Sequence, residues 1–105
     1  MYQITNIVHE YYVTNGRHKN ITKEALARRL TANVALATKR ERIVQNKWKY
    51  YLGSFAIKVD HDTNTIYQIS WDNEGKTVSN VRQAKIIQKY VEYGLNSSGN
   101  KIVLK

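Results

Sequence analysis

The chain has 105 residues and carries 17 Lys or Arg against 8 Asp or Glu, which gives a formal net charge of +9. Its composition, 42% hydrophobic and 10% aromatic, fits a single domain over residues 1–105 and excludes a chain that is disordered throughout. The absence of cysteine excludes disulfides and thiolate zinc sites. Since the sequence shows neither a secretory signal nor a membrane-spanning run, we expect a cytoplasmic protein with no membrane partner.

The first expected element is a helix over residues 2–14. Its apolar residues recur at spacings of three and four, and Asn15-Gly16 offers a left-handed residue to end it. His9 lies near the edge of the apolar face. An isolated histidine of this kind is more often packed or solvated than catalytic, because catalysis needs a partner within hydrogen-bond reach.

Nearly all the net charge lies between Arg17 and Lys49. This segment holds ten Lys or Arg and two Glu, so it accounts for eight of the nine net positive charges. A field concentrated in this way favours a polyanionic partner, because each basic side chain placed against a phosphate releases condensed counterions. Nucleic acid is therefore the expected partner.

The same segment is typical of two short helices. Thr22 is a suitable N-cap for a helix that ends near Leu30, and Ile21 is placed to pack against Leu26. Residues 31–33 break the pattern. Asn33 can then cap a second helix that continues to Asn46, with one apolar and one basic face.

The string ITKEALARRL over 21–30, the three-residue break and the second helix resemble a helix-turn-helix, and with a hairpin over 50–72 they resemble its winged form. In that family the second helix enters the major groove of DNA. The resemblance therefore implies groove-facing roles for Asn33, Val34, Ala35, Thr38, Lys39 and Arg42. Two packed helices of a small core would explain the same pattern.

Two strands are expected next, over 50–60 and 65–72, joined by a turn over 60–64. Gly53 inside the first strand indicates a bulge or the close approach of another backbone. Asp60, His61 and Asp62 have the chemistry of metal ligands, but turn propensity already explains both aspartates. We expect neither a metal nor a cofactor.

The C-terminal third is predicted to form a loop and then a helix over 77–93, whose apolar stripe makes it a candidate for homodimerisation. Residues 96–100 have the composition of a flexible loop. Residues 101–105 are a candidate terminal strand that either joins the hairpin or pairs with another copy. The predicted fold class is α+β, in the order α-α-α-β-β-α.

An aromatic and basic cluster, Trp48-Lys49-Tyr50-Tyr51, follows the basic segment. Aromatic rings stack on unpaired bases while lysines hold phosphates, so this cluster suits single strands or RNA as well as a duplex edge. Alternatively, Trp48 and one tyrosine anchor the hairpin to the helices.

These observations favour a small, non-catalytic DNA-binding regulator, with DNA preferred over RNA. One alternative is a phage or mobile-element protein that binds and inhibits a host protein acting on nucleic acid. Another is a small ribonuclease toxin that uses a histidine as base. The expected nucleic-acid-binding residues are Arg28, Arg29, Asn33, Thr38, Lys39, Arg40, Arg42, Lys47, Trp48 and Lys49.

Overall fold

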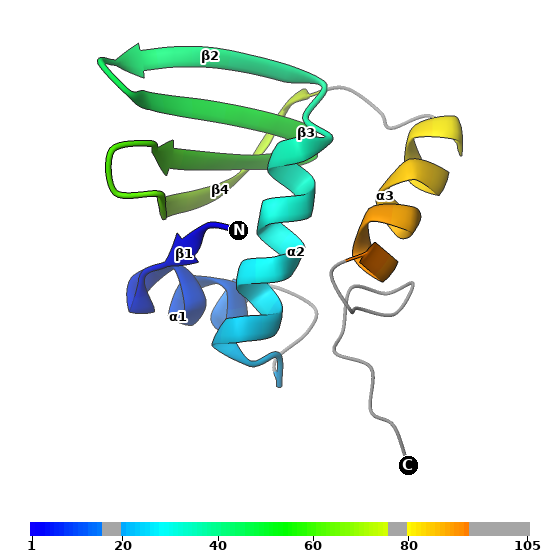
Figure 1. Cartoon of the computed structure of the whole chain (residues 1–105), viewed down its shortest axis with the longest axis horizontal. Coiled ribbons are helices and arrows are strands. Elements are labelled where there is room, and N and C mark those ends of the chain that lie inside the picture. The colour runs from blue at the N-terminus through cyan, green and yellow to red at the C-terminus, as the bar shows by residue number, and fades with distance from the viewer. Residues whose placement is uncertain (16–19, 76–79, 93–105) are drawn as a thin grey trace.

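The computed structural model describes residues 1–15, 20–75 and 80–92, which form helices against a mixed four-stranded sheet (Figure 1). The predicted α+β class is confirmed. The elements in chain order are β1 (Gln3–Ile4), α1 (Asn6–Asn15), α2 (Lys23–Ala35), β2 (Lys39–Val44), β3 (Lys47–Asp60), β4 (Thr65–Gly75) and α3 (Asn80–Glu92). The strand order is β1-β4-β3-β2, with β1 parallel to β4 and the other pairs antiparallel.

Helix α1 begins later than the sequence pattern indicated. Gln3 and Ile4 pair with the start of β4 and form β1, so they are not available to the helix. Thr5 then caps α1, because its hydroxyl accepts a hydrogen bond from the amide of Val8 at 3.2 Å and its carbonyl accepts one from His9 at 3.2 Å. The register with β4 therefore sets the start of α1.

Helix α2 begins as predicted and continues past the expected break. The Thr22 hydroxyl accepts a hydrogen bond from the amide of Ala25 at 3.1 Å, which confirms the N-cap. Thr31 does not interrupt the helix, because its hydroxyl donates to the carbonyl of Ala27 at 2.7 Å and so finds a partner one turn back. The predicted break over 31–33 is wrong.

The predicted helix from Asn33 to Asn46 is also wrong. Residues 33–35 complete α2, and Lys39–Val44 form β2, which pairs antiparallel with the first part of β3. Ile43 and Val44, assigned to an apolar helical stripe, are 45% and 53% exposed. The second helix on which the helix-turn-helix resemblance rests is not formed, and the observed order is β-α-α-β-β-β-α.

Strand β3 includes the predicted strand over 50–60 and bends back on itself at Gly53. A straight strand of its 14 residues would span ~45 Å at about 3.3 Å per residue. Yet the amide of His61, just after β3, donates to the carbonyl of Asn46, just before it, at 2.9 Å. Gly53 has a φ of 59°, and the pairing with β4 shifts between Gly53 and Phe55. The turns at both ends of β3 consequently lie at the same end of the sheet (Figure 1).

The core lies between the sheet and the helices. Its fully buried members include Val8 of α1, Leu26 and Leu30 of α2, and Val59 and Ile66 of the sheet. The helices and the strands thus share one apolar interior.

Helix α3 joins this core differently from the prediction. Tyr90 is buried, and its hydroxyl donates to the side-chain oxygen of Asn33 at 3.0 Å. Ile87 and Val91, two members of the predicted apolar stripe, are 42% and 58% exposed.

The predicted flexible loop over 96–100 and terminal strand over 101–105 lie outside the described residues. None of the helices described here has the length and apolar character needed to cross a bilayer.

We predict that Gly53→Ala lowers the free energy of unfolding by about 1 kcal/mol, because a Cβ is disfavoured in the left-handed region. Gln45 provides an opposite control, since it has a φ of 47° without being glycine. Gln45→Gly should leave stability unchanged or raise it slightly. Denaturant unfolding measures both variants. Equal destabilisation by the two changes would contradict the assignment of the bend to Gly53.

Candidate nucleic-acid interface

Five of the ten Lys or Arg in the predicted basic segment lie on the β2–β3 hairpin, residues 39–51. We call this element the basic hairpin. It carries five Lys or Arg and one acidic residue, Glu41. Strand β2 forms one edge of the sheet, and all of its residues are exposed. The basic residues are Lys39, Arg40, Arg42, Lys47 and Lys49.

The side chains of the hairpin alternate between two faces, because successive residues of a strand point to opposite sides. Directly paired residues share a face. Lys39 and Glu41 lie opposite Tyr51 and Lys49 on one side, which we call the lysine face. The other side, the arginine face, is formed by the pairs Arg40–Tyr50 and Arg42–Trp48.

On the lysine face, Tyr51 organises the charges around it. The side chain is only 1% exposed, and its hydroxyl donates to the Glu41 carboxylate at 2.7 Å. Burial raises the pKa of Tyr51, and the bond to Glu41 raises it further. The ammonium groups of Lys39 and Lys49 lie 5.1 and 4.8 Å from the centre of its ring. The positions of both lysines are thus tied to one buried ring.

A third lysine, Lys47, lies against the neighbouring strand. Its ammonium group is 5.7 Å from the centre of the Tyr67 ring on β4. Such a contact arises because the bend in β3 lays the hairpin alongside the second half of the sheet. The lysine face of the hairpin therefore continues onto β4.

On the arginine face, Tyr50 is fixed at both ends. Its ring packs against the core, and its hydroxyl is hydrogen-bonded to Nε2 of His61 at 2.7 Å. Burial raises the pKa of Tyr50, the neighbouring Tyr2 adds to this, and the charge of Arg40 opposes it. Arg42 is oriented by the turn, because its Nε donates to the carbonyl of Gln45 at 2.6 Å. This face offers two guanidinium groups beside ordered rings.

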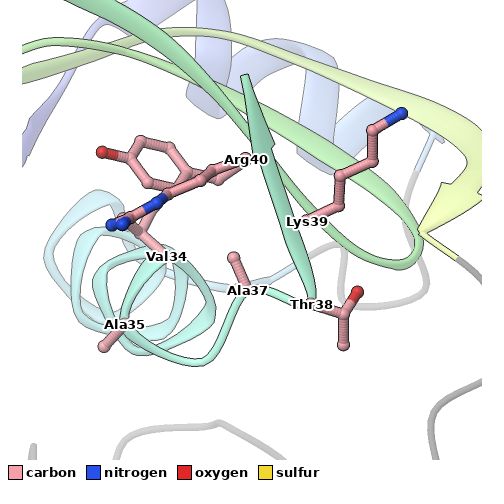
Figure 2. A pocket seen from close by; sticks show the side chains of 7 residues that line it. Val34, Ala35, Ala37, Thr38, Lys39 and Arg40 are labelled. Atoms are coloured by element: carbon pink, nitrogen blue, oxygen red, sulfur yellow. The ribbon is translucent and has the colours of Figure 1, made fainter. Parts of the chain in front are cut away.

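A pocket of about 220 Å³ lies where the arginine face meets the C-terminal end of α2 (Figure 2). Val34, Ala35 and Ala37 supply apolar surface, and Arg40 and Tyr50 belong to the hairpin side. Figure 2 shows the Arg40 side chain extending above Val34, while Lys39 leaves the strand on the opposite side. Thr38 also lines the pocket, and its amide and hydroxyl both bond to the carbonyl of Tyr51, at 2.8 and 3.2 Å.

Three predicted site residues lie on α2, away from the hairpin. Arg28 forms an ion pair with Glu24 at 2.7 Å. The guanidinium of Arg29 lies 5.8 Å from the Tyr12 ring centre and 5.7 Å from that of Tyr90. Asn33, expected to face the groove, is 8% exposed.

The buried position of Asn33 has a structural cause. Its side-chain oxygen accepts the hydroxyl of Tyr90, so it joins α2 to α3. The structure therefore brings together Thr38, Lys39, Arg40, Arg42, Lys47, Trp48 and Lys49 but not Arg28, Arg29 or Asn33.

The sequence contains a signal for this hairpin that helical periodicity obscured. The β-branched pair Ile43-Val44 precedes Gln45-Asn46, and the aromatic-rich stretch from Trp48 to Tyr51 follows after Lys47, which is a pattern of two strands around a two-residue turn. This pattern predicts a strand over residues 39–44.

The turn over 60–64 is used for structure. An oxygen of Asp60 accepts the amide of Asp62 at 2.9 Å, and the Asp62 carboxylate accepts the side chain of Asn46 at 2.7 Å. Among residues 1–15, 20–75 and 80–92, no group of three or more His, Cys, Asp or Glu side chains is placed to hold a metal ion. Asp62 thus joins the two turns, and Asp60 stabilises the turn in which it lies.

Comparisons with protein-family models, with curated proteins and with solved structures give no significant match to this chain.

We predict that Tyr51→Phe lowers the free energy of unfolding by about 1 kcal/mol, because the Glu41 carboxylate loses its bond to a buried hydroxyl. A double-mutant cycle with Glu41→Ala, followed by denaturant unfolding, should give a coupling energy of similar size. Tyr11→Phe is the matched control, since Tyr11 is exposed. An effect of Tyr51→Phe as small as that of the control would contradict this arrangement.

Proposed function

We propose that the chain is a non-catalytic nucleic-acid-binding protein, a small DNA-binding regulator that grips phosphates with the basic hairpin. The observation that carries this proposal is the position of five basic residues on a two-stranded antiparallel ribbon at the exposed edge of the sheet. Each cation that meets a phosphate releases counterions, and this entropy gain drives binding without regard to base sequence. The ribbon takes the place of the helix that the sequence pattern predicted as the DNA contact.

The shape of the hairpin supports DNA as the partner. The major groove of B-DNA is wide enough to admit a two-stranded β-ribbon, and several DNA-binding proteins read it with strands. Alternation along such a ribbon sends Arg40 and Arg42 to one side and Lys39 and Lys49 to the other. A ribbon that enters the groove with one of these sides towards the base edges would carry cationic side chains close to the phosphates that line the groove.

Charged residues on an edge strand also prevent sheets from joining edge to edge, a role that requires no ligand. Other features of the hairpin do not fit that role alone. Ile43 and Val44 are exposed near the turn, and Trp48 is only half-buried on the arginine face. Apolar side chains there would promote association between sheets, whereas thymine methyl groups and base edges are suitable partners for them.

We predict that the affinity for a duplex falls steeply with salt and that Arg42→Ala reduces the slope of log K against log salt by about one phosphate contact. Fluorescence anisotropy with a labelled duplex at several salt concentrations measures the slope. Arg28→Ala is the control, because this arginine is paired with Glu24 on α2. Affinity that does not change with salt, or equal slopes for the two variants, would refute the proposal.

The Tyr50 hydroxyl and His61 form a hydrogen-bonded pair near Arg40. Among the described residues, this pair is the best candidate for a ribonuclease mechanism. For a non-catalytic protein we predict that labelled RNA stays intact after prolonged incubation with the wild type. Denaturing gel electrophoresis checks this. Cleavage by the wild type that disappears in His61→Gln would instead establish the ribonuclease alternative.

A further inference from the structure

The pocket between α2 and the arginine face has room for one small group. Its volume of about 220 Å³ lies below the ~300–1,000 Å³ of typical small-molecule pockets. The space would accept a single heterocycle and is too small for a base pair. The volume of the pocket therefore limits its occupant to a group about as large as one nucleobase.

The floor and the mouth of the pocket differ in charge. The floor is the C-terminal end of α2, where the helix dipole places partial negative charge. A phosphate in the floor would be repelled, whereas Arg40 of the hairpin attracts a phosphate to the mouth. This polarity fits an uncharged ring with hydrogen-bond donors that is attached to a phosphate.

The walls suit an aromatic ligand. Unpaired bases stack on tyrosine rings and on arginine guanidinium planes. The ring of Tyr50 is already held by the core and by His61, and Arg40 is its direct partner across the hairpin. Because Tyr50 is ordered in advance, binding would cost little side-chain entropy on that side.

We propose that this pocket binds one unpaired nucleobase while Arg40 holds the adjoining phosphate, so that the chain prefers DNA with an unpaired base to a fully paired duplex. The inference rests on the proposed nucleic-acid function and adds a recognition site to it. A base inside a duplex would first have to leave its stack, which costs free energy that an unpaired base does not require. The basic hairpin grips the backbone on either side, and the pocket recognises the defect in pairing.

The test compares a duplex carrying a single-base bulge with the fully paired duplex, using 2-aminopurine as the bulged base. We expect about tenfold tighter binding of the bulged duplex, the effect of stacking one base, together with a change in 2-aminopurine fluorescence on binding. Ala37→Leu places a larger side chain in the pocket without changing any charge. It should remove the preference and the fluorescence change while leaving the affinity for the paired duplex as it is.

Two further variants keep the test decisive. Ala84→Leu is the matched control, because it makes the same substitution at an exposed site on α3. Arg40→Lys keeps the charge but loses the guanidinium plane, so it should weaken the preference and preserve the salt slope, even if Ala37→Leu fails to fold.

The outcomes separate the two proposals. Equal binding of both duplexes by the wild type, with the salt dependence intact, would overturn the pocket and leave the phosphate grip standing. A preference that persists in both Ala37→Leu and Arg40→Lys would also overturn it. Failure to bind either duplex would overturn the proposed function itself.

Discussion

The bend at Gly53 is the constraint on which the rest of the structure depends. Because the backbone there adopts a left-handed conformation, β3 folds back and carries the β2–β3 turn to the β3–β4 turn. Hydrogen bonds then join the two turns, from the amide of His61 to Asn46 and from the side chain of Asn46 to Asp62. Without the bend, the basic hairpin would extend away from the domain with little to hold it.

The bend also decides what surrounds each face of the hairpin. Tyr50 reaches His61 only because the start and end of β3 lie together, and Lys47 reaches the ring of Tyr67 for the same reason. These contacts order both faces of the hairpin. Pre-ordered side chains lose less entropy on binding, which supports the recognition role proposed for the hairpin.

Basic residues that lie close together in the sequence have different roles in the fold. On α2, Arg28 balances Glu24, and Arg29 lies over the aromatic rings of Tyr12 and Tyr90. On the hairpin, five cations share a narrow exposed ribbon with a single acid. A high net charge alone would not have distinguished basic residues that support packing on α2 from those that lie on the exposed edge of the sheet.

Local chemistry in the sequence was enough to predict several elements. Thr22 caps α2 because its hydroxyl is the first acceptor available to that helix, and this depends only on its neighbours. The hairpin over 50–72 could be predicted for a similar reason, since alternation and turn residues occur in one continuous stretch. The basic character of residues 39–49 was visible as well, and all six predicted site residues there lie on one hairpin.

The tertiary structure alone decided the form of residues 39–44 and the fate of Asn33. A short segment with mixed polarity fits a helix or a strand about equally well, and pairing with β3 settled the choice through hydrogen bonds to a distant part of the chain. Asn33 became buried because Tyr90, 57 residues later, donates its hydroxyl to it. Such partners are set by the path of the chain through space, so periodicity along the sequence carries no record of them.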